Sequence, residues 1–225
     1  MSKHLAYHLE ELRIALADGD ERRVLPRVLD GESTILDVGC GIGQSLVALG
    51  TDRRRCIGID VDEAAIRHGV QTFGDRLRLE VAGAERIPLE AGSVDLVMCR
   101  VSLPYTNVPR ALAEMRRVLR PGGRVWLTLH QRRTAQGYLR EAWRARSPRR
   151  IAHVLYILAN GWLLELTGRV LPYPNGRYES WQSPQAVSRR LVRLGFEVEV
   201  GTEGRHTVVE GRLPRAAHGQ GRPGA

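Results

Sequence analysis

This chain of 225 residues has few cysteines, and its first residues lack a long apolar run. The three cysteines, Cys40, Cys56 and Cys99, are odd in number and far apart, so they argue against a disulfide framework and form no CxxC pair. The first 20 residues contain no continuous apolar run of signal-peptide length. We therefore expect no metal site and a reducing, cytoplasmic location.

Lysine is nearly absent although the chain is strongly basic. Lys3 is the one lysine among 34 basic residues, and the formal net charge is +9. Such a charge can indicate a nucleic-acid partner or an anionic membrane surface. The near-exclusive use of arginine also fits a coding bias, with arginines scattered over a solvated surface. A nucleic-acid partner is therefore the less favoured interpretation.

Apolar residues make up 43% of the chain, which is enough for a sizeable core. Between residues 35 and 130, short apolar runs alternate with helical patterns. An alternation of this kind is typical of an α/β fold with a doubly wound, mostly parallel sheet, in which ligands bind at the carboxyl ends of the strands. The pattern predicts strands at 34–39, 56–61, 76–82, 94–101 and 124–130, and helices at 44–50, 62–73 and 109–120.

The regions on either side of this alternation differ in character. An amphipathic helix is predicted over 4–17, where leucines recur at helical spacing. Residues 131–183 are first basic, then apolar over 151–169, then turn-rich and aromatic. A helix from Pro184 and closing strands at 196–200 and 206–211 are predicted to follow, and residues 212–225 to be a disordered tail. We divide the chain into an N-terminal helical segment (1–31), a domain (32–211, with 131–183 inserted) and the tail.

The strongest motif is the glycine-rich turn in ILDVGCGIGQ, residues 35–44. A strand delivers Asp37 to a turn in which Gly39, Gly41 and Gly43 let the backbone approach a ligand. Asp60 ends the next strand, where a carboxylate can accept both hydroxyls of a ribose. A dinucleotide site would need a third glycine where Gln44 stands. S-adenosylmethionine, with a cationic sulfonium and an ammonium group, suits the carboxylate that Asp37 places just before the loop.

Several segments together resemble the class I, Rossmann-like methyltransferases that depend on S-adenosylmethionine (SAM), especially the small-molecule branch that includes quinone-biosynthesis enzymes. ILDVGCGIG is similar to the first motif of that family, IGIDVDEAAI to its second-strand segment, and RVLRPGGRVWL to its helix, turn and fifth strand. The resemblance covers residues 33–130 well and 184–211 loosely. It implies a seven-stranded sheet of order 3-2-1-4-5-7-6 with the seventh strand antiparallel, and a helical lid between strands 5 and 6.

The resemblance also implies a set of cofactor contacts. Asp60 would hold the ribose hydroxyls of SAM, and S-adenosylhomocysteine would be the product. Gly83 stands where the family often has an aspartate that binds the adenine amine, so Ala84 or Glu85 would do that work through backbone groups or water. Arg100 ends the fourth strand and would contact an anionic group of the substrate or be a surface arginine; it is also counted among the cofactor candidates. The full set of cofactor candidates is Asp37, Gly39, Cys40, Gly41, Gly43, Asp60, Val61, Ala84, Glu85 and Arg100.

Two residues are candidates for the chemical step. His130 ends the fifth strand, at the catalytic edge of the sheet, and histidine is suited to base work near neutral pH. Tyr105 follows the fourth strand and could line the methyl path. The alternative for His130 is a histidine that only caps a strand. SLPY at 102–105 also resembles the motif of amino methyltransferases weakly, since Leu103 replaces a proline.

The sequence supports three functional hypotheses. The first is an enzyme that methylates a small, fairly apolar molecule at oxygen or carbon. The second is an RNA or protein methyltransferase, and the third is a SAM-binding module without catalysis. The apolar stretch 151–169 would be a lid over the substrate, a homodimer interface or, with the arginines of 140–150, a peripheral membrane contact.

Overall fold

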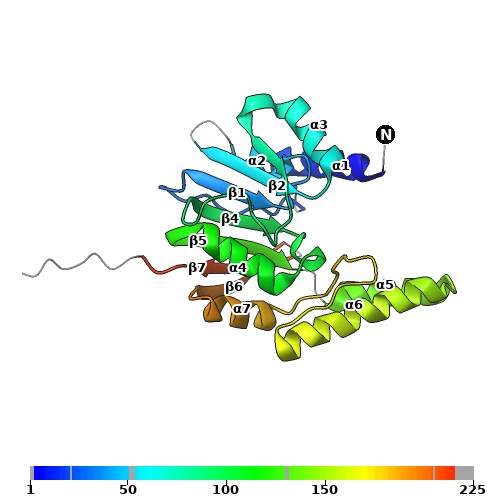
Figure 1. The fold of residues 1–225 in the computed structure, drawn as a ribbon. Helices are drawn as coiled ribbons and strands as arrows, with labels where there is room; N and C mark the ends of the chain where they lie inside the picture. Colours follow the sequence, from blue (N-terminus) through cyan, green and yellow to red (C-terminus); the bar gives the residue numbers. More distant parts are fainter. Residues whose placement is uncertain (1–2, 21, 51–53, 130–131, 205, 216–225) are drawn as a thin grey trace, which may run out of the picture.

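The computed structural model describes residues 3–20, 22–50, 54–129, 132–204 and 206–215 (Figure 1). Helix α1 (Lys3–Leu16) leads to strand β1 (Thr34–Val38), helix α2 (Gln44–Leu49), strand β2 (Arg55–Asp60) and helix α3 (Glu63–Phe73). A 3-10 turn, η1 (Gly74–Arg76), leads to β3 (Arg78–Val81) and β4 (Val94–Arg100). Then come η2 (Leu103–Tyr105), α4 (Val108–Val118), β5 (Leu119–Leu129), α5 (Arg132–Arg144), α6 (Pro148–Thr167), α7 (Pro184–Arg193), β6 (Glu197–Glu203) and β7 (His206–Arg212).

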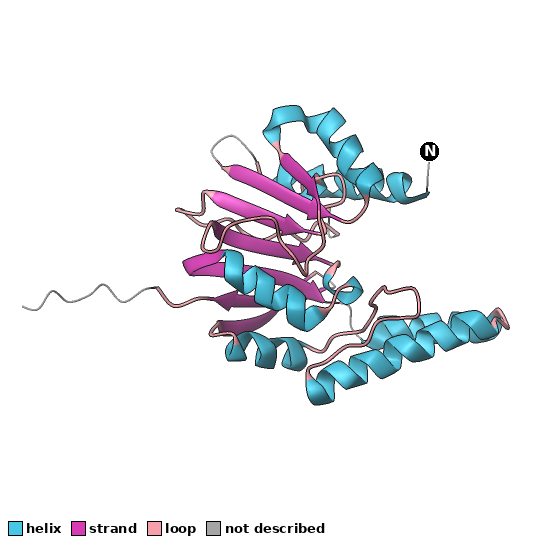
Figure 2. Ribbon diagram, viewed as in Figure 1, coloured by secondary structure: helices cyan, strands magenta, loops and turns pink. Residues whose placement is uncertain are grey.

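The seven strands form one sheet in the order β3-β2-β1-β4-β5-β7-β6, which confirms the predicted fold. Strands β1 to β5 pair in parallel, and β7 is antiparallel to both β5 and β6. The carboxyl ends of the parallel strands therefore meet at one edge, where β7 begins rather than ends (Figure 2).

Helices cover both faces of the sheet and form two parts of the core. On one face, Leu36, Val97 and Leu127 pack with residues of α4 and α7 such as Leu112 and Leu191. On the other face, Ile35, Met98 and Trp126 pack with Leu46 of α2 and Ile66 of α3. Helix α1 lies against α2 and α3 on this second face.

The fifth strand differs from its prediction. The helix expected over 109–120 ends at Val118, and β5 begins at Leu119 instead of residue 124. Leu119 already pairs with Val94, and the register then shifts before Arg124 pairs with Leu96. Gly123 permits this irregular passage because a side chain there would lie 3.0 Å from the Asp95 carbonyl oxygen. Pro121 and the two glycines after it therefore lie within the strand, and the helix ends before them.

The ordered domain also extends beyond the boundary that the composition predicts. Leu213 is buried, its amide donates to the Gly123 carbonyl, and the Gly122 amide donates to the carbonyl of Pro214. Residues 212–215 are therefore packed against the start of β5, and only 216–225 of the predicted tail lie outside the described residues.

Helices α5 and α6 form a hairpin that projects from the sheet domain on the side of the carboxyl edge (Figures 1 and 2). They are inserted between β5 and β6, as predicted. Within the described residues, no helix has both the length and the apolar character needed to cross a membrane.

Candidate active site

The strand register brings predicted site residues from separate strands to one face of the sheet. Asp37 of β1 pairs with Gly58 of β2 and Met98 of β4, so its side chain points to the same face as theirs. Asp60 and Arg100 each follow two residues later on those strands and share that face. Arg100 in turn pairs with Thr128 of β5. The carboxyl edge thus carries Asp37, Asp60 and Arg100 side by side, on the face that α1 covers.

The glycine loop has the backbone that the sequence predicts. Gly39, Gly41 and Gly43 have φ values of 80°, 58° and 91°, a region that residues with a side chain rarely adopt. A side chain at Gly39 would also overlap Ser102, and one at Gly43 would come within 2.6 Å of Leu77. The loop is therefore restricted to glycine both by conformation and by space.

Asp60 is fixed by backbone donors. Its Oδ2 accepts a hydrogen bond from the Gly41 amide at 2.8 Å, and its Oδ1 accepts one from the Asp62 amide at 2.9 Å. Asp62 caps α3 by accepting from the amides of Ala64 and Ala65. The hydrogen bond from Gly41 ties the glycine loop to the end of β2. Because Asp60 is only half-buried, its carboxylate can still accept further hydrogen bonds from a ligand on the solvent side.

Asp37 is fully enclosed and incompletely satisfied. Its Oδ1 is buried and has no hydrogen-bond partner among the described residues. Burial raises the pKa of Asp37 to about 7; Arg100 lowers the pKa and Asp60 raises it further. A buried acceptor without a partner is costly, so this atom suits a cationic or donor group brought by a ligand.

The remaining cofactor candidates are Cys40 in the glycine loop and Val61, Ala84 and Glu85 after strands β2 and β3. The Cys40 side chain is buried against Gly58, and burial raises the pKa of its thiol, so only the Cys40 backbone faces the loop. Val61 is exposed at the end of β2 and lies close to Gly83. Ala84 is buried, and Glu85 accepts the Asn107 amide at 2.6 Å, which ties the segment after β3 to the start of α4.

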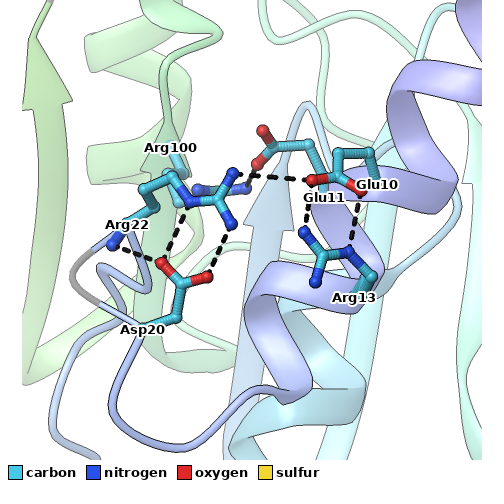
Figure 3. A network of polar contacts seen from close by, with 6 residues as sticks. All are labelled: Glu10, Glu11, Arg13, Asp20, Arg22 and Arg100. Carbon is cyan, nitrogen blue, oxygen red and sulfur yellow. Dashed lines mark hydrogen bonds and ion pairs between the residues drawn. The ribbon is translucent and has the colours of Figure 1, made fainter.

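Arg100 makes a contact that the sequence does not predict. Its guanidinium donates to Glu11 of α1, and both side chains are largely buried (Figure 3). Farther out on α1, Glu10 pairs with Arg13 and Arg22. The ion pair from Glu11 to Arg100 holds α1 against the carboxyl edge of the sheet. Arg100 is therefore neither a lone surface arginine nor an unpaired anion-binding group.

Tyrosines line the same region. Tyr138 in α5 lies close enough to raise the pKa values of Tyr7 in α1 and Tyr105 in η2. Burial, together with the neighbouring Glu179, raises the pKa of Tyr105 to about 12. Its phenol therefore stays protonated at neutral pH and can donate a hydrogen bond but cannot act as a base. His130, the other candidate for the chemical step, lies outside the described residues.

A strained residue marks the turn after β4. Val101 has φ of 53°, an outlier for a β-branched residue, and its amide donates to Thr128 Oγ1 at 2.9 Å. The Ser102 hydroxyl then donates to the Gly39 carbonyl at 3.2 Å. Such strain is concentrated at functional sites. No motif signals this turn, because its conformation depends on contacts with two other strands.

His206 is a second residue that the sequence analysis misses. It begins β7, which runs antiparallel to β5, and its neighbour Thr207 pairs with Leu129 at the end of β5. His206 lies two residues before Val208, which pairs with Thr128, so it shares the face of Arg100. Burial lowers the pKa of His206, and Arg100 lowers it further. A neutral imidazole therefore stands at the carboxyl edge at physiological pH.

Comparison with known proteins gives one family. The profile of the family described as "Methyltransferase domain" matches residues 36–127. A malonyl-(acyl-carrier protein) O-methyltransferase of Methylococcus capsulatus is 34% identical over 116 residues, which are 49% of this chain and 42% of that protein. The uncharacterized methyltransferase YcgJ of Bacillus subtilis is 27% identical over 121 residues, 51% of this chain and 48% of that protein. This chain thus matches less than half the length of these relatives.

Solved structures share the fold across most of the chain. The crystal structure of YcgJ has a TM-score of 0.58 at 15% identity and covers 93% of this chain and 100% of that one. A possible histamine N-methyltransferase of Thermotoga maritima has a TM-score of 0.55 at 18% identity and covers 93% of this chain and 90% of that one. At these identities the likeness shows the fold alone.

Proposed function

We infer the function of this chain from one premise: residues 36–127 belong to the methyltransferase domain family and are built on the class I, Rossmann-like fold. We propose that the chain binds SAM and transfers its methyl group to a small, fairly apolar acceptor at oxygen or carbon. When bound, SAM would supply a methyl group activated by its sulfonium: the acceptor atom bonds to the methyl carbon in line as the bond to sulfur breaks, and S-adenosylhomocysteine leaves. The residues of this chain orient the two reactants.

The observation that carries the proposal is the pair of carboxylates around the glycine loop. The buried Asp37 Oδ1, without a partner among the described residues, fits the ammonium group of the cofactor. Asp60, held by two backbone amides, fits the ribose hydroxyls. The exposed Val61 offers an apolar surface for the adenine, with Ala84 and Glu85 beside it.

Groups at the acceptor side support a small apolar substrate. Tyr7, Tyr105 and Tyr138 provide aromatic surface, and the Arg100 charge is balanced by Glu11, so the region favours planar or apolar molecules over a polyanion. Among the described residues, His206 is one group suited to accept a proton from a hydroxyl acceptor; His130 remains a prediction for the same role. We also propose a cytoplasmic location, where the three buried thiols stay reduced.

Calorimetric titration of SAM and S-adenosylhomocysteine tests the cofactor proposal. We expect micromolar binding, weakened about 10- to 100-fold by Asp60→Ala, because a charged acceptor of two hydrogen bonds is lost. Glu63→Gln is the matched control, since Glu63 is a surface carboxylate near Asp60 that pairs only with Arg67 among the described residues. Absence of binding by the folded wild-type protein contradicts the proposal.

The acceptor is tested separately by release of S-adenosylhomocysteine. Phenolic and quinone-like compounds should support turnover, and His206→Gln should lower kcat more than it changes cofactor affinity. Turnover only with RNA or protein would overturn the acceptor class while leaving the cofactor proposal intact. Cofactor binding with no turnover of any acceptor would favour a binding module.

A further inference from the structure

Helix α6 has two apolar faces. The buried face carries Val154, Ile157, Gly161 and Leu164, which recur at helical spacing toward the rest of the molecule. The opposite face carries Ala152, Leu155, Ala159, Trp162 and Leu166, which recur at the same spacing and are all exposed. Leu166 is 78% exposed, Leu155 52% and Trp162 46%. We call this second set the outer stripe.

The outer stripe is unusual for a surface helix. A helix at the edge of a water-soluble domain normally turns charged residues outward, and one that is apolar all round normally has a second partner. Glu165 is the one acidic residue of α6, and it is half-buried, with its carboxylate 2.6 Å from Arg189. Between Ala152 and Leu166, no acidic or arginine side chain of α6 therefore lies within the outer stripe.

The surroundings of the outer stripe are basic. Arginines are exposed at the end of α5, in the turn and in the first turn of α6, and no ion pair of the described residues involves them: Arg140, Arg144, Arg146, Arg149 and Arg150. Arg169 is exposed just beyond the other end of the helix. Trp143, 63% exposed, stands among these arginines. Both ends of the stripe thus carry positive charge.

The hairpin is also placed to meet a surface. Helices α5 and α6 extend away from the sheet domain, and their connecting turn forms its far end (Figure 1). An α-helix of 20 residues is about 30 Å long, so the stripe offers a long, narrow apolar contact. A helix with an apolar face, basic flanks and tryptophan is suited to lie in the boundary between lipid headgroups and acyl chains.

We propose that the α5–α6 hairpin docks on an anionic lipid surface, with the outer stripe entering the headgroup boundary and the flanking arginines contacting acidic headgroups. Charge decides against a second copy of the chain as the occupant. Each copy carries a net charge of +9, and pairing two outer stripes would bring the exposed arginines of both copies together. Acidic lipid headgroups would instead neutralise the arginines. A docked hairpin would hold the arginines within a Debye length of these headgroups, so that salt does not fully screen the attraction.

Vesicle co-sedimentation of the full chain tests this proposal without any need for cofactor or turnover. We expect binding to phosphatidylcholine vesicles in which about a third of the lipid is phosphatidylglycerol, and much weaker binding to phosphatidylcholine alone. Leu166→Glu should weaken binding about tenfold or more, because it places a charge in the apolar contact. Val192→Glu on α7 is the matched control, since Val192 is 59% exposed and lies outside the hairpin.

A second variant measures the electrostatic contribution to vesicle binding separately from the apolar contribution. Arg149→Glu with Arg150→Glu should lower binding to anionic vesicles by about fivefold or more per residue and remove much of its salt dependence. Equal binding by the wild type and Leu166→Glu, or no binding by the wild type, overturns the proposal. A wild-type dimer in light scattering that Leu166→Glu dissociates, without vesicle binding, would assign the stripe to a second copy. Failure here leaves the methyltransferase proposal untouched, because the site residues are not changed.

Discussion

At the scale of single residues, Asp37 combines burial with an unused acceptor. A carboxylate enclosed by strands on both sides is destabilised in its charged form, and its raised pKa records that cost. Between about pH 4 and pH 7, the folded chain holds a proton that the unfolded chain releases, so this group lowers stability as the pH rises through that window. A ligand cation beside Asp37 would reverse that penalty.

The affinity for SAM should therefore depend on pH. The ammonium group of SAM binds the ionised carboxylate of Asp37 better than the protonated form. SAM binding should therefore tighten by up to tenfold per pH unit as the pH rises from about 5 to about 7, and level off above about 7. Titration calorimetry across this range measures the slope. Asp37→Asn should bind more weakly and lose the slope, whereas an unchanged slope in Asp37→Asn would assign the pH dependence to another group.

At the scale of elements, the glycine inside α6 has a packing role. A side chain at Gly161 would overlap the ring of Trp181, whose Nε1 donates to the Leu158 carbonyl at 3.1 Å. Trp181 also packs edge-on against Trp162, with ring centroids 5.5 Å apart. The close approach of helix and indole thus joins α6 to the loop that follows it.

Two glycine variants should therefore change stability in opposite directions. Gly161→Ala should lower the free energy of unfolding by about 1–3 kcal/mol, because α6 or Trp181 must move. Gly137→Ala, in the middle of α5, should raise it by about 0.5–1 kcal/mol, because nothing lies within 4 Å of the added methyl group and alanine favours the helix. Urea denaturation measures both. If Gly137→Ala also lowered the free energy of unfolding, the added methyl group would have to meet a neighbouring atom, which contradicts the open space beside Gly137.

At the scale of the whole molecule, ion pairs connect parts of the chain that lie far apart in sequence. Arg124 of β5 is almost fully buried, donates to Glu32 at 2.5 Å and pairs with Glu210 of β7 at 3.0 Å. Glu11 and Arg100 likewise join α1 to β4. The Glu11–Arg100 pair, together with a hydrogen bond that Arg124 donates to the Arg27 carbonyl, holds the N-terminal segment (1–31) on the sheet.

Breaking the Arg124 contacts should therefore destabilise the whole fold. Arg124→Met should lower the free energy of unfolding by about 3–5 kcal/mol, because it leaves the Glu32 carboxylate, which is only 10% exposed, without its cation. Arg13→Met, which removes a solvent-exposed pair with Glu10, should change stability by less than about 1 kcal/mol. Thermal unfolding of both variants checks this difference. Similar losses would show that burial does not set the strength of these pairs.

Much of the fold follows from patterns within short stretches of chain. The alternation of strands and helices and the glycine turn at Gly39, Gly41 and Gly43 depend on local conformational preference, so the sequence predicts them. The order of the strands followed from the resemblance to a family and is confirmed. The predicted start of β5 is wrong: proline and glycine favour the end of a helix at 120, but the pairing of Leu119 with Val94 overrides that preference.

The sequence by itself determined the presence of a glycine loop, the acidic strand ends and the apolar stretch at 151–169, because each depends on residues that follow one another in the chain. The tertiary structure alone decided which groups meet there. Arg100 faces Glu11 across 89 residues, and His206 reaches the carboxyl edge only because β7 runs antiparallel to β5. It also decided that α6 buries one apolar face and leaves the other exposed. Contacts between distant residues depend on how the whole chain packs, and no local pattern encodes them.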